Sequence, residues 1–256
     1  MIPCVIPYYK DKEKLRRCIG CLKKQTMPVE IHVEDDSELG TGYTAAVNRG
    51  LRHWLNKAIE WEYIIILNQD MYLEPKSVES FYNFMQSNHR CGAAVAIQRI
   101  AERPHMGFGG GADCYPQGIA HDVEIKRYVE DYPVFWGDNA AQIIRKATIW
   151  DIGILDENFV LICSDSDYSL RARSRGWEVW IVVNAIGTHE KGLSMDSSPE
   201  VEKQKDNDRR VFYHKWVSPN YYEKMKYETG KPIYQQCDGF WLKAEYKSER
   251  TERVYG

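Results

Sequence analysis

The chain has 256 residues, a length that suits one large α/β domain or two small ones. Hydrophobic residues make up 43% and charged residues 28%, which is typical of a globular protein with a sizeable core. The formal net charge of −3 gives no electrostatic reason to bind nucleic acid or an anionic membrane. No run of about 18 apolar residues and no leader pattern is visible, so we expect a soluble, cytoplasmic protein without a transmembrane segment.

Seven cysteines are scattered along the chain, and their odd number favours a reducing compartment. Cys18 and Cys21 form a C-x-x-C spacing, but no second pair or nearby histidine completes a zinc site. Cys18 also falls on the apolar face of an expected helix. We therefore interpret this pair as structural.

Strand and helix patterns alternate over the first hundred residues. Strands are expected at 2–9, 29–34, 63–67 and 92–98, and helices are expected after Asp11, at 44–59 and from Pro75. This alternation predicts βαβ units, which build a mostly parallel sheet with helices on both faces. In such sheets, ligands bind at the carboxyl ends of the strands.

The second half is less regular. Residues 101–135 are rich in glycine and proline and show no period, so they are expected to form a lid or binding loop. The stretch 158–177 predicts a strand followed by a helix that Ser164 caps and Gly176 ends, and 178–183 predicts another strand. The tail, 217–256, carries no recognisable motif.

Three acidic groups fall at expected strand or helix ends: Glu34-Asp35-Asp36, Asp70, and Asp165 with Asp167. Each alone is most simply a solvated turn or a helix cap. Together at one sheet edge they would repel one another unless a cation compensates, and a divalent ion shared with ligand phosphates would do so. His189 follows a strand as well, and an imidazole ligand favours Mn²⁺ over Mg²⁺.

These segments resemble one known family. The stretches CVIPYYKDKEKLRRCIGCLKKQTMPVEIHVEDDS, GYTAAVNRGL, YIIILNQDMYL, SDSDYSLRARSRGW and IGTH are similar, in order and spacing, to motifs of the inverting glycosyltransferases of family two. The resemblance covers about residues 3–216 and implies the GT-A fold, with a nucleotide-binding half at 1–100, an acceptor-binding half at 101–216 and a C-terminal extension at 217–256. A rhamnosyltransferase-like subgroup is one open alternative.

The resemblance implies a role for each matching position. The donor would be a UDP- or dTDP-sugar, the acceptor a glycan or glycolipid hydroxyl, and the cofactor Mn²⁺ or Mg²⁺; a homo-oligomer stays open. Asp165 would be the catalytic base, and the helix dipole would keep it ionised at pH 7. The other expected contacts are Pro7, Glu34, Asp35, Asn48 and Asn68 for the nucleotide, Asp70 and His189 for the metal, and Asp167, Trp136 and Asp138 for the acceptor.

Several positions depart from the family pattern. Asn68 stands where the metal-binding D-x-D motif has its first acid, so the metal site carries one charge fewer. Ser164 replaces the acid that precedes the base, which leaves the choice between Asp165 and Asp167 open. Two other functions therefore stay in view: a non-catalytic nucleotide- or glycan-binding module, and a sugar-nucleotide nucleotidyltransferase. The latter needs a glycine-rich loop after the first strand, which residues 8–12 do not provide.

Overall fold

The computed structural model describes residues 1–111, 123–190 and 198–216. Strands and helices alternate at the start of the chain, as the sequence predicts. The first five elements are β1 (Ile2–Tyr8), α1 (Lys12–Leu22), β2 (Val29–Asp35), α2 (Tyr43–Leu55) and β3 (Tyr63–Leu67). The others are β4 (Met71–Leu73), α3 (Ser77–Ser87), β5 (Cys91–Ile100), β6 (Arg103–Phe108), β7 (Gly110–Gly111), β8 (Val123–Glu124), the 3-10 turn η1 (Ile125–Arg127), β9 (Tyr132–Pro133), β10 (Trp136–Gly137), β11 (Ala141–Arg145), α4 (Lys146–Ile152), α5 (Ser164–Ser174), β12 (Glu178–His189) and α6 (Pro199–Trp216).

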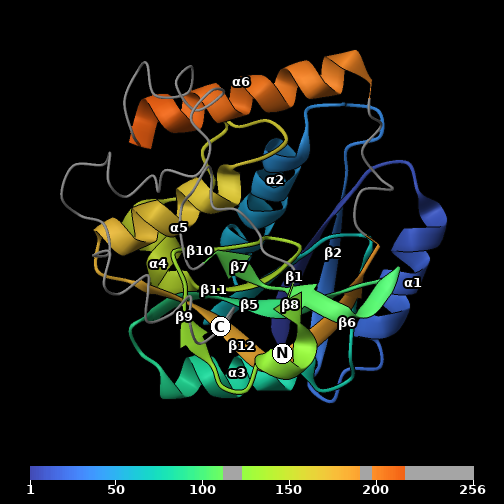
Figure 1. The fold of residues 1–256 in the computed structure, drawn as a ribbon, viewed down its shortest axis with the longest axis vertical. Coiled ribbons are helices and arrows are strands. Elements are labelled where there is room, and N and C mark those ends of the chain that lie inside the picture. Colours follow the sequence, from blue (N-terminus) through green and yellow to red (C-terminus); the bar gives the residue numbers. More distant parts are fainter. Residues whose placement is uncertain (112–122, 191–197, 217–256) are drawn as a thin grey trace.

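The strands of the central sheet follow the order β2-β1-β3-β11-β5-β12-β4. Figure 1 shows the sheet and the helices around it. β1 pairs in parallel with β2 and β3, and β12 pairs in parallel with β5. β11 is antiparallel to both β3 and β5, so β5 runs in the direction of β3, while β4 is antiparallel to β12. All strands of this path except β11 and β4 therefore share one direction. Their carboxyl ends lie at one edge of the sheet, where ligands bind in such folds.

Helices cover both faces of this sheet because alternate strand residues point to opposite sides. In β3, Ile65 and Leu67 belong to a core cluster with residues of α1 and α3. Ile64 and Ile66 belong to a second cluster with residues of α2, α4 and α5. All four side chains are fully buried. Burial on both faces explains why this strand reads as a continuous apolar run.

Three predicted elements differ from the structure. Residues 158–163 form turns and bends instead of the expected strand. Helix α2 ends at Leu55, four residues before the expected end at 59. Strand β12 continues to His189 beyond the predicted end at 183, with a register shift between Val182 and Ile186. This irregularity breaks the alternating pattern on which the shorter prediction rested.

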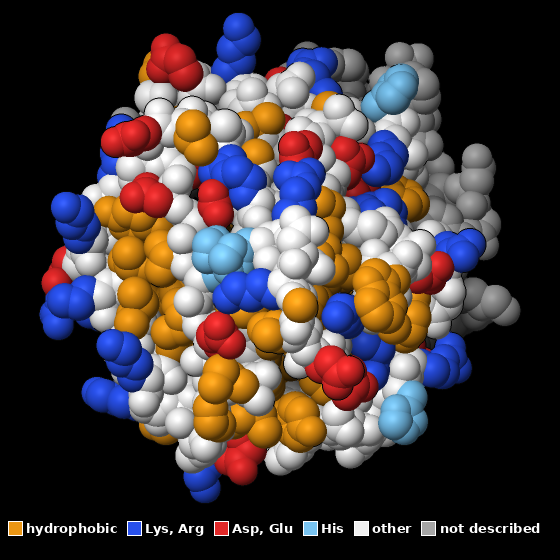
Figure 2. Space-filling view, turned by 180° about the vertical axis from the view of Figure 1, so that it is seen from behind, with side chains coloured by type: hydrophobic (Ala, Val, Ile, Leu, Met, Phe, Trp, Pro, Cys, Tyr) orange, Lys and Arg blue, Asp and Glu red, His pale blue; other side chains and the backbone are white. Residues whose placement is uncertain are grey.

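The segment 101–135 is more regular than expected, because it contains the short strands β6, β7, β8 and β9. Residues 112–122 of the expected lid lie outside the described residues, and so does the tail from 217. Within the described ranges, no helix is long and apolar enough to cross a membrane. On the face shown in Figure 2, Lys and Arg side chains are interspersed with Asp and Glu side chains. That face therefore offers no basic footprint for nucleic acid.

Candidate active site

The loops that follow β1 and β3 are joined by the side chain of Gln69, the middle residue of the polar triplet Asn68-Gln69-Asp70 after β3. Gln69 Oε1 accepts a hydrogen bond from the Tyr9 backbone N–H at 2.8 Å, and Gln69 Nε2 donates to the Tyr9 carbonyl at 3.1 Å. The Lys10 N–H donates to Ser37 Oγ at 3.0 Å and so joins the loop after β2. These bonds hold together three neighbouring loops at the carboxyl edge of the sheet.

The expected nucleotide-binding acids at the end of β2 differ in their surroundings. Glu34 is partly buried and pairs with Arg49 Nε of α2 at 2.7 Å and with His32 Nε2 at 3.1 Å. Asp35 is exposed, and a hydrogen bond from Ser37 holds the pKa of its carboxyl below the ordinary value. Asp35 is therefore accessible to a ligand and ionised at neutral pH.

Asp36 is the buried acid of this turn. Its carboxylate accepts hydrogen bonds from Thr41 Oγ1 at 2.6 Å, Arg49 Nη2 at 2.7 Å and the Gly42 N–H at 3.0 Å. Burial alone would raise the pKa of Asp36, but the bonds from Thr41 and Arg49 outweigh it and keep the pKa below the ordinary value. Asp36 thus folds the loop that leads into α2.

The Asn48 side chain forms hydrogen bonds within the protein and is not available to bind a nucleotide. Its side chain is fully buried, donates to the Leu155 carbonyl at 2.9 Å and to Glu157 at 2.8 Å, and accepts from the Leu155 N–H at 3.0 Å. The structure therefore gives Asn48 a structural role, contrary to the prediction. Pro7 is buried in β1 and lies opposite Glu34 in the parallel register.

Asp70 and His189 lie together at the carboxyl edge, as expected for a metal site. His189 Nε2 is 3.3 Å from Asp70 Oδ1, and both side chains are nearly buried. The other ring nitrogen, Nδ1, is 2.7 Å from Gln98 Oε1. Because an amide oxygen only accepts, this contact places the proton of a neutral imidazole on Nδ1 and directs the lone pair of Nε2 toward Asp70. A proton or a cation is needed between these two atoms.

Asp70 and His189 do not belong to a larger cluster of acidic, histidine or cysteine side chains in the described part of the chain. Among the described residues, no group of three or more His, Cys, Asp or Glu side chains could hold a metal ion. Asn68 is partly exposed, and its Oδ1 is buried without a hydrogen-bond partner within that part of the chain. The Asp70–His189 pair fits a hard divalent ion only if a ligand and water supply the remaining oxygens.

The second pair of acids is Asp165, in the first turn of α5, and Asp138, in the turn between β10 and β11. Burial and the neighbouring Asp138 carboxylate raise the pKa of Asp165 from 3.8 to about 7. Burial, and then the charges of Asp138, Asp165 and Asp70, raise the pKa of the Tyr43 hydroxyl. The charges of all three carboxylates therefore act on Tyr43. The raised pKa runs against the expectation that the helix dipole keeps Asp165 ionised at pH 7, because burial and a like charge oppose the dipole.

The turn before Asp165 has an unusual backbone. Cys163, not the predicted Ser164, precedes the helix as its cap residue, and its φ of 67° is left-handed. Such a conformation is strained for a residue other than glycine. Ser164 is instead the first residue of α5, and it is buried.

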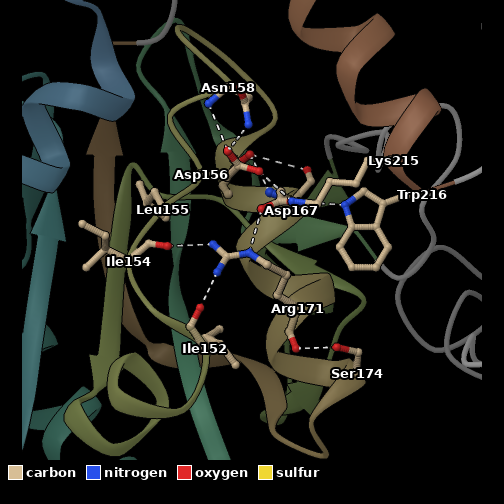
Figure 3. Close-up of polar contacts among 12 residues, drawn as sticks. Ile152, Ile154, Leu155, Asp156, Asn158, Asp167, Arg171, Ser174, Lys215 and Trp216 are labelled. Atoms are coloured by element: carbon tan, nitrogen blue, oxygen red, sulfur yellow. Dashed lines mark hydrogen bonds and ion pairs between the residues drawn. The ribbon is translucent and has the colours of Figure 1, made fainter.

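Asp167 is not an acceptor contact in this structure, contrary to the prediction. It is fully buried, and Figure 3 shows its carboxylate enclosed by side chains of α5 and α6. Arg171 Nε donates to it at 2.8 Å, Trp216 Nε1 donates at 2.8 Å, and Lys215 Nζ lies 2.7 Å away. Asp167 therefore fastens α6 to α5.

Helix α6 also fixes the loop before α5. Asp208 is fully buried and accepts hydrogen bonds from three consecutive backbone N–H groups, those of Val160, Leu161 and Ile162, at 2.7–3.1 Å. These N–H groups pair with a side chain and not with a neighbouring strand, which is why the predicted strand is absent. The carbonyl of Val160 in turn accepts from the Thr44 N–H of α2.

Trp136 and Asp138 are the other two residues that the sequence analysis assigned to the acceptor. Trp136 is 5% exposed in β10, which pairs with Gly110 and Gly111 of β7. Asp138 is partly exposed and accepts from the Ala140 N–H at 2.7 Å. The sequence analysis assigned no role to Tyr43 or Gln98. Nothing in their local sequence shows that Gln98 contacts His189 or that the charges of the acidic residues act on Tyr43.

Comparisons with known proteins agree with this fold. No protein-family model matches the sequence, and no curated protein matches it. A crystal structure of GalNAc-T7 with UDP, GalNAc and Mn²⁺ superposes with a TM-score of 0.61 at 14% identity over 99% of this chain and 55% of that chain. Residues 1–349 of S. aureus TarS with UDP-GlcNAc give a TM-score of 0.54 at 14% identity over 83% of this chain and 73% of that chain.

A second crystal structure of the same TarS fragment gives a TM-score of 0.53 at 13% identity over 89% of this chain and 75% of that one. The chain spans little more than half of the GalNAc-T7 chain that it matches. At these identities the likeness shows the fold. The chain has the GT-A fold, a mixed α/β architecture with a mostly parallel central sheet between helices, which confirms the fold predicted from the sequence.

Proposed function

We propose that this protein is an inverting, metal-assisted glycosyltransferase. It moves a sugar from a UDP- or dTDP-linked donor to a hydroxyl group of a glycan or glycoconjugate acceptor. The observation that carries the proposal is the meeting of two acidic pairs at one edge of the sheet. Asp70 is in contact with His189, the charge of Asp138 acts on Asp165, and the charges of Asp70, Asp138 and Asp165 all act on the Tyr43 hydroxyl.

The nucleotide would bind over the ends of β1 and β2. Asp35 is exposed and ionised, so it can accept hydrogen bonds from a base or a ribose. Arg49 and His32 orient the Glu34 carboxylate, and Gln69 keeps the neighbouring loop in place. Similar folds are occupied by UDP in the GalNAc-T7 structure and by UDP-GlcNAc in the TarS structure, which supports a nucleotide-sugar donor here.

Mn²⁺ or Mg²⁺ fits between the nucleotide and the acidic edge. Asp70 Oδ1 and His189 Nε2 would hold it, and Gln98 would keep the imidazole lone pair directed at it. Bound there, the ion acts as a Lewis acid for the negative charge that the leaving diphosphate gains. The nitrogen ligand favours Mn²⁺, and the GalNAc-T7 structure contains Mn²⁺.

Asp165 would take the proton from the acceptor hydroxyl. A general base works best when its pKa is near the working pH, and the pKa of Asp165 is raised to about 7. Displacement with inversion requires the acceptor hydroxyl to attack from the side opposite the leaving diphosphate. Separate acidic pairs for the diphosphate and the acceptor are consistent with that requirement.

The strongest alternative is a non-catalytic nucleotide- or glycan-binding module of the same fold. Asn68, in place of an acid, favours it because the metal site loses a charge. The deciding experiment follows release of nucleoside diphosphate from UDP- and dTDP-sugars with Mn²⁺, for the wild type and Asp165→Asn. An enzyme loses turnover in the variant by roughly 10²–10⁴-fold and keeps its nucleotide affinity. A binding module shows nucleotide binding without turnover in either protein.

A further inference from the structure

Asn139 has a buried side-chain amide without hydrogen bonds. It lies in the turn between β10 and β11 and is 3% exposed. Both Nδ2 and Oδ1 are buried, and neither has a hydrogen-bond partner in the described ranges. Leaving a buried donor and acceptor unpaired destabilises a fold, so such a group calls for a physical explanation.

The backbone of Asn139 lies at the centre of the candidate site. Its N–H group is hydrogen-bonded to the Asp165 carboxyl group, and its carbonyl accepts from the Tyr43 hydroxyl at 3.4 Å. The next carbonyl, that of Ala140, accepts the Asn68 N–H at 2.9 Å, two residues before Asp70. Asn139 therefore lies between the expected metal ligand and the expected base, where the reacting sugar must be bound.

Position distinguishes Asn139 from other unpaired amides of the chain. Gln142 is also fully buried with both side-chain polar atoms unpaired, but it lies within β11, between β3 and β5. Gln142 lies opposite Ile66, one pair inside the carboxyl end of β3, and is flanked by strands on both sides. Gln142 is therefore a control for an unpaired buried amide that is enclosed by the sheet.

We propose that Asn139 is a specificity-determining residue that binds the transferred sugar. Its amide presents one acceptor and two donor hydrogens, so it complements a sugar substituent that offers a donor and an acceptor together. Two adjacent hydroxyl groups or an acetamido group have this chemistry. The inference rests on the proposed function, because it places the sugar of the donor between Asp70 and Asp165.

The test compares wild type, Asn139→Leu, Asn139→Ala and Gln142→Leu. Dissociation constants are measured with Mn²⁺ for UDP, UDP-glucose and UDP-N-acetylglucosamine, with dTDP and dTDP-glucose as the thymidine series. The melting temperature of each free protein is measured in parallel. The ratio of sugar-nucleotide affinity to diphosphate affinity isolates contacts with the sugar from contacts with the nucleotide.

We expect both Asn139 variants to bind the free diphosphate as wild type does. The ratio of sugar-nucleotide affinity to diphosphate affinity should fall roughly tenfold. A loss with the glucose donors assigns Asn139 to adjacent hydroxyls, and a loss with UDP-N-acetylglucosamine alone assigns it to the acetamido group. Asn139→Leu should not lower the melting temperature, because it removes an unpaired amide, and Gln142→Leu should leave every affinity ratio unchanged.

Unchanged affinity ratios in the Asn139 variants would overturn the inference, and so would a lowered melting temperature with equal losses for diphosphate and sugar nucleotide. The latter pattern would mean that Asn139 only supports the fold. Absence of diphosphate binding in the wild type would instead overturn the proposed function, and the inference with it.

Discussion

Asp165 and Asp167 are two residues apart on α5, and their carboxylates have opposite surroundings. Burial and the charge of Asp138 raise the pKa of Asp165 to about 7. Asp167 is fully buried between Arg171, Lys215 and Trp216. One acid can therefore exchange a proton near neutral pH, and the other is held in ion pairs that join two helices.

The pH dependence of turnover should report Asp165. Its ionised form is the base, so kcat/KM should rise through an apparent pKa near 7. Asp138→Asn removes the like charge that helps to raise this pKa, so the rising limb should move to lower pH. Asp151→Asn, which changes a carboxylate paired with Arg175, serves as the control and should leave the limb in place. A limb that does not move in Asp138→Asn would contradict this assignment.

Stability should also depend on Asp165. Its folded pKa is raised, so the folded protein binds more protons than the unfolded chain between pH 3.8 and about 7. The free energy of unfolding should therefore fall as the pH rises through this range, by at most about 4 kcal/mol. The Asp165→Asn variant has no ionisable group at this position. Its free energy of unfolding relative to wild type, measured by urea titration, should therefore be higher at pH 8 than at pH 5. Equal differences at both pH values would exclude the raised pKa.

Asp167→Asn should act on stability and not on the chemical step. It breaks a buried pair and leaves Arg171 and Lys215 short of a counter-charge, which costs about 3–5 kcal/mol of unfolding free energy. Urea unfolding measures this loss, and nucleotide titration at a temperature where the variant is folded should give the wild-type affinity. Loss of turnover at wild-type stability would instead make Asp167 the base.

The Asp70–His189 pair should be sensitive to its support. Gln98→Leu removes the acceptor that fixes the imidazole proton on Nδ1, so the enhancement of UDP binding by Mn²⁺ should fall roughly 10–100-fold. Asp70→Asn should remove most of this enhancement, while UDP binding without Mn²⁺ changes little. Calorimetric titration with and without the metal measures both effects. Wild-type enhancement in both variants would place the metal elsewhere.

Helix α6 should be required to hold the loop before Asp165. Asp208→Leu leaves three partly buried backbone N–H groups unpaired, and we expect a loss of about 3 kcal/mol in the free energy of unfolding. Asp206→Asn, which removes a largely exposed pair with Arg210 on the same helix, should cost less than about 1 kcal/mol. Similar losses in both variants would show that the loop is held by other contacts.

The parallel part of the fold could be read from the sequence because strand and helix patterns alternate over the first hundred residues. The antiparallel strand β11 could not, since its insertion between β3 and β5 depends on pairing across more than 70 residues of sequence. The same limit applies to the predicted strand at 158–163. Its N–H groups are satisfied by Asp208, nearly fifty residues later, and nothing local to the strand sequence shows this.

For the site, the strand-end rule and the family resemblance brought Asp70, His189, Asp138 and Asp165 to one edge. They could not separate Asp165 from Asp167, because the burial of Asp167 and its contacts with α6 depend on residues nearly fifty positions later. The dipole argument for Asp165 is incomplete for a similar reason. The charge of Asp138 reaches it only through the folded turn between β10 and β11.

The most direct test of the account is thermal unfolding with UDP, dTDP, GDP and CMP, each with and without Mn²⁺. A ligand at about 100 times its dissociation constant adds roughly 2.7 kcal/mol of stability, which raises the melting temperature of a chain this size by several degrees. The account predicts a rise with UDP or dTDP that Mn²⁺ increases, and that Asp70→Asn no longer shows the Mn²⁺ increment. No rise with any of the four nucleotides, with or without Mn²⁺, would contradict it.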